Sequence, residues 1–520
     1  MELLDEWVIT FRESESSSSS TATTFKPLYY FIDEDFGETL FKGICELLWG
    51  QRMRLKNVLF ALSGLLIVVG FLMLLVPLTD ILLGDELSYS FLILGAVLVI
   101  VGYASFKKTQ SLSVIESLLV ASLAWLVIPT LSALALVMEI RIDFVDAFFE
   151  SMSGFTGTGF TVLTPSTLKK SILMWRALMQ WTGELGIVVF AMIVIPYFYE
   201  TARTVYGLER PLRIGMNLYE TAKRLILVYV TLTLIGFVSY VMTGLTPFDA
   251  LTHIMTTIAT GGMSTYNEGY NIIYAYSPSS AIPFIVFMTL GALNFIVLYN
   301  LITGNFREVL RSEELRYFIL VLIILSVITG ATYYVLEGRD FMNGFFNQVS
   351  GMSTTGFNIG SLKNLKSFTK SLLILGMFLG GMTFSTAGGI KTLRLVMFLK
   401  RLSIYTEKTV LPPSVIKRVV IQGQTVSEEE ISISFMLISL YVMTAFIISS
   451  LITLFNAEYS FIDALFETVS ALSCVGLSVE VITPTAPLAV KFLIVLAMYI
   501  GRLEFTPLLV LRSLATRRKY

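Results

Sequence analysis

Four polar segments recur in an otherwise apolar chain, and each ends in small or hydroxyl-bearing residues and a glycine. Each segment starts with an Asp or Asn and reaches its glycine thirteen residues later: Asp146 to Gly159, Asp249 to Gly262, Asn343 to Gly356, and Asp463 to Gly476. Glycine allows backbone conformations that a Cβ forbids, so neighbouring carbonyl oxygens can turn toward one axis. Four converging sets of carbonyl oxygens can replace the hydration shell of a monovalent cation. The chemistry that this pattern favours is cation binding by backbone oxygens.

The candidate filter residues are those that end the four segments. They are Thr156, Gly157, Thr158 and Gly159; Thr260, Gly261 and Gly262; Ser353, Thr354, Thr355 and Gly356; and Ser473, Cys474, Val475 and Gly476. The residues before them suit a short helix, and the leading Asp or Asn is a residue type that caps helix N-termini. The C-terminal ends of these helices would point inward, where their dipoles favour cations over anions. The alternative is that the small residues only allow close helix packing.

The elements that must position these segments are apolar stretches long enough to cross a bilayer. The chain has 520 residues, of which 55% are hydrophobic and 14% are charged. A helix of about 20 apolar residues spans the hydrocarbon core. Ten such stretches are predicted: 57–78, 91–106, 118–138, 172–199, 225–243, 281–302, 315–336, 371–399, 433–455 and 488–512. The sequence therefore predicts an all-α polytopic membrane protein.

Each short helix lies between two predicted spans and is itself too short to cross. It must enter and leave the membrane from one side, and non-helical backbone at that depth has to be buried in protein or line a watery cavity. We expect four pseudo-symmetric membrane-pore loop-membrane repeats around one pore, plus two extra N-terminal transmembrane helices. The expected divisions are a cytoplasmic tail (1–50), the two extra helices (51–109) and the repeats (110–205, 206–310, 311–420 and 421–520).

The placement of charge predicts the orientation of the spans. The net charge is only −1, but Lys and Arg gather in alternate loops, densely between Arg203 and Arg224, whereas residues 79–88 hold acids and no Lys or Arg. By the positive-inside rule both termini are cytoplasmic. We therefore expect a multi-pass protein of the cytoplasmic (inner) membrane, surrounded by lipid.

The eighth predicted span contains a glycine-rich interruption between Gly380 and Gly389. So many glycines disfavour a helix, and the span is expected to break just inside the filter. A broken span at this depth can act as a gating flap; the alternative is a kink that only aids packing. The expected gate residues are Gly380, Gly381, Thr383, Ser385, Thr386, Gly388, Gly389 and Lys391, together with Arg502 of the last span.

With these motifs the chain resembles the TrkH/KtrB-like potassium transporters, and in particular their TrkH branch. Besides the four segments, the resemblance rests on WRALMQWTGELGI from Trp175, LGGMTFSTAGGIKTLR from Leu379 and GRLEFTPLL from Gly501, and it covers residues 110–512. It implies uptake of K+ through a central filter, with a gating loop within the membrane below it. At the first filter-glycine position, serine accompanies sodium permeation in this family, so Gly159 favours potassium.

The resemblance also implies partners for this chain. They are a second copy in a homodimer and a cytoplasmic ring of Rossmann-type nucleotide-binding regulatory subunits, for which the basic segments 203–224, 306–316 and 401–418 offer a docking face. Neither an organic cofactor nor a nucleic acid is expected. The sequence departs from the family pattern in loops two (ATGGM) and four (SCVGL), and at Glu184, where a small residue is usual.

Arg502 is a charge deep within the last apolar stretch. Such a charge costs at least about 2.5–3.5 kcal/mol unless it is paired or hydrated. Glu504 lies on a different helix face and is not an obvious partner. Since its family counterpart faces the pore as an electrostatic barrier, we expect the same of Arg502. The alternative is a buried pair with a carboxylate of another helix, for which Glu184 is a candidate.

Other function classes lack the residues that they need. The chain has one histidine and two cysteines, so neither a soft-metal site nor a disulfide framework is expected. His253 shares its repeat position with Glu150, Asn347 and Glu467, which favours packing or hydrogen bonding. No HExxH motif and no pair of Asp residues at catalytic spacing is visible, so an enzyme is not expected. No nucleotide-binding loop is visible either, so any nucleotide control must come from another chain.

A sodium-coupled or proton-coupled solute symporter is an alternative, because symporters also use broken helices. Their repeats are usually inverted or two-fold, whereas this repeat is four-fold and parallel. Glu268 and Glu480 follow loops two and four on the predicted external side. They could concentrate cations at the mouth, or be ordinary solvated acids.

Overall fold

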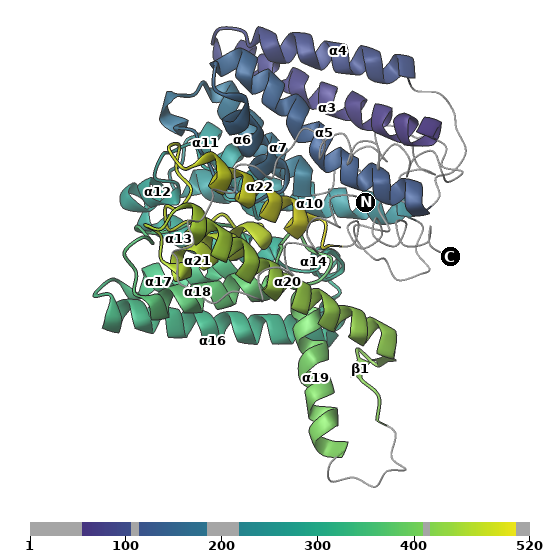
Figure 1. Ribbon diagram of the computed structural model, residues 1–520, viewed down its shortest axis with the longest axis vertical. Helices are drawn as coiled ribbons and strands as arrows, with labels where there is room; N and C mark the ends of the chain where they lie inside the picture. The colour runs from purple at the N-terminus through teal and green to yellow at the C-terminus, as the bar shows by residue number, and fades with distance from the viewer. Residues whose placement is uncertain (1–54, 106–113, 185–217, 409–416, 506–520) are drawn as a thin grey trace, which may run out of the picture. The chain divides into compact units, whose positions relative to one another are not determined.

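The computed structural model describes residues 55–105, 114–184, 218–408 and 417–505, and these are almost entirely helical (Figure 1). The strands in this part form one antiparallel pair, β1 (Val420–Ile421) with β2 (Gln424–Thr425). The predicted tail over 1–50 and the basic segment 203–217 lie outside the described residues.

Five of the described helices are long and apolar enough to cross a membrane. They are α3 (Leu55–Leu83), α5 (Val114–Ile140), α10 (Leu218–Met242), α16 (Glu313–Leu336) and α20 (Glu428–Phe455). Many of their large apolar side chains are exposed, for example Phe71, Leu234, Ile323 and Phe446. Such surfaces are favourable against lipid, because hydrocarbon contact removes the penalty that water would impose.

Other predicted spans appear as shorter helices. They are α4 (Tyr89–Ser105), α7 (Lys170–Glu184) and α22 (Leu488–Arg502). The remainders of two predicted spans, 185–199 and 506–512, lie outside the described residues. Helix α3 packs on α4, α5 and α7.

Within the described residues, two of the predicted spans are broken. The predicted break in the eighth span is confirmed, because α18 (Ser367–Leu379) and α19 (Thr392–Lys408) are separate helices that run in different directions in Figure 1. The apolar stretch 281–302 is not one continuous helix, because α13 (Ala281–Gly291) and α14 (Phe295–Ile302) are bent by 118° relative to each other. The physical reason is Asn294, whose side chain accepts a hydrogen bond from the Ile296 N–H and so starts a new helix.

Four short helices of twelve residues each precede the candidate filter residues. They are α6 (Phe144–Phe155), α11 (Pro247–Ile258), α17 (Phe341–Met352) and α21 (Phe461–Leu472). Each packs on the long helix before it, namely α5, α10, α16 and α20. The buried core of the described residues includes the faces where these short helices meet α7, α13, α18 and α22.

The N-caps of these helices lie three residues before the predicted ones. They are Asp143, Thr246, Asp340 and Ser460. The predicted caps lie instead in the first helical turn, where an acid still interacts favourably with the helix dipole. Short connecting elements complete the fold: η2 (Pro165–Thr167), α12 (Tyr270–Tyr276), η4 (Pro278–Ser280) and α15 (Phe306–Arg311).

Candidate functional site

The four candidate filter segments share one backbone conformation. Their final glycines have φ of +85°, +73°, +88° and +88°. Two positions earlier, the chain is again left-handed at Gly157, Thr260, Thr354 and Cys474, with φ of +71°, +50°, +57° and +52°. Non-glycine residues rarely adopt this conformation, so surrounding contacts must impose it. The common sequence register therefore corresponds to a common path of the backbone.

The final glycines also bring the four segments together. A Cβ on Gly159 would overlap the carbonyl oxygen of Gly261, and a Cβ on Gly262 would overlap that of Thr355. In the same way Gly356 faces the Val475 carbonyl. Gly476 faces the carbonyl of Thr158, so the fourth segment returns to the first. Each segment thus touches the next through a glycine, and we call this closed arrangement the glycine ring.

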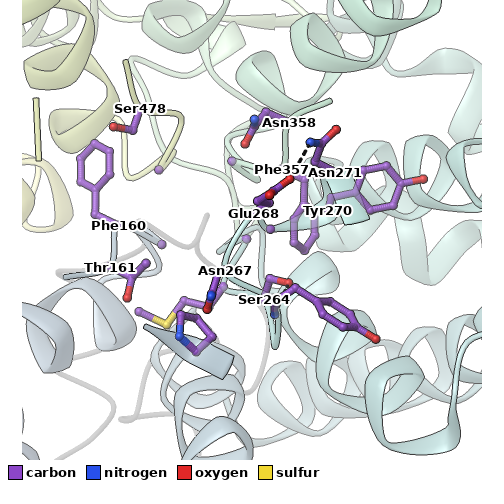
Figure 2. A pocket seen from close by; sticks show the side chains of 18 of the residues that line it. Phe160, Thr161, Ser264, Asn267, Glu268, Tyr270, Asn271, Phe357, Asn358 and Ser478 are labelled. Carbon is purple, nitrogen blue, oxygen red and sulfur yellow. Dashed lines mark hydrogen bonds between the residues drawn. The ribbon is translucent and has the colours of Figure 1, made fainter. Parts of the chain in front are cut away.

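All four ring glycines line one cavity of about 440 Å³. Figure 2 shows the polar side chains around it, among them Thr161, Ser264, Asn358 and Ser478, which come from all four repeats of the sequence pattern. We call this space the outer cavity. It brings together residues that are far apart in the sequence, as a shared lumen requires.

The two acids expected at the mouth both line the outer cavity. Glu268 accepts a hydrogen bond from Asn271, whereas Glu480 forms an ion pair with Lys363 at 2.9 Å. The hydrogen bond and negative charge of Glu480 raise the pKa of Lys363. The charge of Glu480 is therefore largely offset by Lys363.

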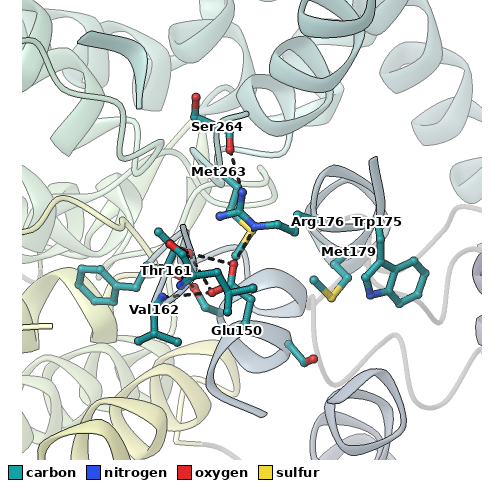
Figure 3. Close-up of polar contacts among 12 residues, drawn as sticks. Glu150, Thr161, Val162, Trp175, Arg176, Met179, Met263 and Ser264 are labelled. Atoms are coloured by element: carbon teal, nitrogen blue, oxygen red, sulfur yellow. Dashed lines mark hydrogen bonds and ion pairs between the residues drawn. The ribbon is translucent and has the colours of Figure 1, made fainter. Parts of the chain in front are cut away.

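The residues at the repeat position of His253 hold the segment behind each ring glycine. Glu150 accepts hydrogen bonds from the Thr161 hydroxyl and the Val162 N–H, as Figure 3 shows. Asn347 binds both backbone groups of Ile359, and Glu467 accepts from the Val479 N–H. His253 Nε2 lies 2.9 Å from the Ser264 hydroxyl. The predicted hydrogen-bonding role of His253 is confirmed.

One face of α7 carries three buried polar residues at intervals of four. Arg176 pairs with Glu150 at 2.7 Å and donates to the Ser264 carbonyl (Figure 3), so it ties the first segment to the second. Gln180 donates to the Gly261 carbonyl and accepts from the Met263 N–H. The third is Glu184. No role was predicted for Arg176 or Gln180, although a polar stripe of helical period on an apolar helix is a usable signal.

Ion pairs link neighbouring repeats at the start of the short helices. Lys370 of α18 binds Asp463 of α21 at 2.5 Å, and Lys491 of α22 binds Asp146 of α6 at 2.6 Å. Both lysine side chains are mostly buried. Removing one partner of such a pair is costly, because it leaves the other charge buried without compensation.

The broken eighth span lies against the other end of the filter segments. Thr386 donates to the carbonyls of Ile258 and Gly291, and the Gly388 N–H donates to the Thr354 hydroxyl at 2.8 Å. A Cβ on Gly388 would overlap the Ser473 carbonyl. Of the predicted gate residues between 380 and 391, Thr386 and Gly388 therefore lie against the candidate filter segments.

A second, smaller space of about 90 Å³ adjoins this loop. Lys391, Arg394, Cys474 and Arg502 line it together with residues 383–389. We call it the inner cavity. One of its basic residues, Arg394, forms an ion pair with Glu504.

The loop between α18 and α19 is also held from behind. Glu314, buried at the start of α16, accepts a hydrogen bond from the Thr383 N–H at 2.6 Å. Asn294, at the unexpected break between α13 and α14, donates to the Thr383 carbonyl at 2.7 Å. Neither residue was predicted, because both contacts depend on partners about 70 to 90 positions away.

Arg502 forms the pair that was the alternative expectation. Its guanidinium lies 2.7 Å from Glu184 Oε2, also donates to the Gly183 carbonyl, and stacks 4.8 Å from the centre of the Trp125 ring. The same side chain lines the inner cavity. The two readings of Arg502 are thus not exclusive, because the arginine is paired and also borders the space beneath the filter segments.

Comparison with known proteins gives the family. The TrkH family of cation transport proteins matches residues 89–519. The chain belongs to the TrkH family. An uncharacterized cation transporter of Methanocaldococcus jannaschii is 30% identical over 475 residues, which cover 90% of this chain and 97% of that protein. The Trk system potassium uptake protein TrkH of Escherichia coli K12 is 29% identical over 446 residues, which cover 82% of this chain and 91% of that protein.

A solved TrkH structure has the same fold. The crystal structure of the potassium transporter TrkH from Vibrio parahaemolyticus aligns with a TM-score of 0.78 at 25% identity, over 88% of this chain and 98% of that chain. Membership of the TrkH family confirms the resemblance seen in the sequence. It also places the chain among transporters rather than enzymes, and its apolar helices are those of a multi-pass membrane protein.

Proposed function

We propose that this TrkH-family protein takes up potassium through the glycine ring. The observation that carries the proposal is the closed set of glycine-to-carbonyl contacts at the floor of the outer cavity. Backbone oxygens held in this way can replace the water around a dehydrated alkali cation. The similarity to proteins named for potassium uptake supports K+ as the transported ion.

The proposed pathway runs from the outer cavity through the filter segments to the inner cavity. With both termini cytoplasmic, the outer cavity faces the exterior and the inner cavity faces the cytoplasm of a cell with this protein in its cytoplasmic membrane. An inward-moving cation then gains about 2.3 kcal/mol per 100 mV of membrane potential. The four repeats (110–205, 206–310, 311–420 and 421–520) would each supply one filter segment, with the two extra helices (51–109) outside them.

The loop between α18 and α19 is the proposed gate. It contacts three of the four filter segments through Thr386 and Gly388, so its displacement would open the path below them. A second copy of the chain and a Rossmann-type nucleotide-binding subunit are proposed as partners that act on this loop from the cytoplasmic side.

The test is ion uptake by cells that lack their own potassium uptake, with potassium, rubidium and sodium compared. Gly356→Ser is expected to lose discrimination between these ions, because its Cβ would overlap the Val475 carbonyl at a left-handed φ. Gly338→Ser is the matched control, since Gly338 has φ +65° but nothing within 4 Å of an added Cβ. Unchanged discrimination in Gly356→Ser would remove Gly356 from the filter.

A further inference from the structure

The first filter segment lacks a side chain that the other three have. At the equivalent position of the repeat, Thr260, Thr354 and Cys474 carry side chains where the first segment has Gly157. A Cβ added to Gly157 would overlap the Oε1 atom of Glu184. The carboxylate of Glu184, which comes from α7, therefore occupies the place of the missing side chain.

This position faces the gate and the inner cavity. The Thr260 hydroxyl donates to Thr386 at 3.2 Å, and the Thr354 hydroxyl accepts from the Gly388 N–H at 2.8 Å. Cys474 lines the inner cavity. Together with the Glu184 carboxylate these side chains form what we call the inner ring, at the cytoplasmic end of the proposed filter.

The fourth member of the inner ring differs from the others in charge and in partner. Glu184 is buried, and its Oε2 binds Arg502 at 2.7 Å. Arg502 is further fixed by the Gly183 carbonyl and the Trp125 ring. Lys391 and Arg394 also line the inner cavity, where Arg394 pairs with Glu504 and Arg502 pairs with the buried Glu184 of α7.

We propose that Glu184 is a positioning residue that sets the barrier to cations at the inner ring. Its carboxylate fixes Arg502 against α7 and offsets the guanidinium charge at the end of the proposed filter. This inference rests on the proposed potassium pathway. It assigns to Glu184 the control of how strongly Arg502 opposes an ion that leaves the filter.

The first test neutralises the acid while preserving its shape. Glu184→Gln is expected to reduce rubidium uptake about tenfold or more, because an unscreened cation then borders the path. The double variant Glu184→Gln with Arg502→Gln is expected to recover most of that loss. Glu458→Gln, an exposed acid elsewhere, controls for the change in net charge. Wild-type uptake in Glu184→Gln would overturn the proposal.

The second test separates the charge of Glu184 from the space that it fills. Gly157→Thr alone would force a side chain into the Glu184 carboxylate, whereas Gly157→Thr with Glu184→Ala restores the arrangement of the other three segments. Thr354, with φ +57°, shows that the equivalent position of another segment holds a threonine in the left-handed conformation. We expect this double variant to unfold at a higher temperature than Gly157→Thr alone and yet to transport poorly, and added Arg502→Gln to restore uptake.

The outcomes of the second test are distinct. Wild-type uptake by the Gly157→Thr, Glu184→Ala variant would show that Glu184 only fills space, which overturns the proposal. If the wild type itself does not discriminate between alkali cations, the proposed potassium pathway is wrong. The unfolding temperatures of the two Gly157→Thr variants, with and without Glu184→Ala, still report whether Glu184 takes the place of the missing side chain. If Glu184→Gln fails to fold, the effect of the Glu184 charge is tested by comparing uptake of the Gly157→Thr, Glu184→Ala variant with and without Arg502→Gln.

Discussion

The Cα of Gly476 lies so close to the carbonyl oxygen of Thr158 that no side chain fits between them. These residues belong to segments more than 300 positions apart, and their contact closes the glycine ring. In a closed ring the position of each segment depends on its contacts with both neighbouring segments. Disturbing one contact should therefore change the geometry of the whole set of carbonyl oxygens.

Gly476→Ala is the direct test of ring closure. Its Cβ would displace the Thr158 carbonyl, so we expect potassium over sodium discrimination to fall while the protein still assembles. Gly304→Ala is the control, because Gly304 has φ +76° but open space around it, and a left-handed alanine costs about 1–2 kcal/mol at either site. Equal ion discrimination in both variants, measured by competitive rubidium uptake, would argue against a closed ring.

The Lys491 to Asp146 pair should stabilise the contact between the fourth repeat and the first. Lys491→Met leaves an acid without its main partner, and we expect a loss of about 1–3 kcal/mol, because the Asp146 side chain is 26% exposed and keeps some hydration. Adding Asp146→Asn should recover much of the lost stability, since the third repeat carries Asn343 at this position. Thermal unfolding in detergent measures the stability of the single and the double variant. No recovery in the double variant would contradict this account.

The sequence predicts the parts of the site that depend on local pattern. The thirteen-residue register located the four segments, and glycine density located the break after α18. Both signals come from neighbouring residues. They suffice because helix length and backbone freedom are largely local properties.

What the sequence did not predict depends on contacts between distant residues. The break between α13 and α14 lies in an apolar stretch, and Asn294 is stabilised there by the Thr383 carbonyl of another repeat. The sequence named Glu184 as a candidate partner of Arg502, but not its contact with Gly157, which depends on how α7 packs against the first segment. Local composition can mark a buried polar residue as unusual, but it does not show which distant backbone group that residue contacts.

His253 should be replaceable by the residue that another repeat uses. We expect His253→Asn to keep uptake, because Asn347 holds the equivalent segment in the third repeat. His253→Leu removes the partner of the Ser264 hydroxyl and should cost about 1–3 kcal/mol of unfolding free energy. Uptake and thermal unfolding are measured on both variants. An Asn variant as unstable as the Leu variant would refute the equivalence of these positions.

Lys363 should weaken the attraction of cations to the outer cavity. Removing it in Lys363→Ala leaves the Glu480 charge without its ion pair, so we expect the half-saturating potassium concentration to fall at low ionic strength. The effect should fade near 0.15 M salt, where the screening length is about 8 Å. Lys363→Ala with Glu480→Gln should return to the wild-type value. A shift that persists at high salt would point to a structural cause instead.

Glu314 should hold the gate loop in the position that the structure shows. Glu314→Leu removes the acceptor of the partly buried Thr383 N–H, which costs about 1–3 kcal/mol where the loop is closed, and we therefore expect rubidium flux to rise. Glu314→Gln keeps an acceptor oxygen and should stay near the wild type. The neighbouring Glu313 pairs with Lys400 of α19 at the partly exposed surface, so Glu313→Gln tests whether loss of any acid at this helix end has the same effect. If Glu314→Leu leaves flux unchanged while lowering the unfolding temperature, the hydrogen bond supports the fold but does not restrain the gate.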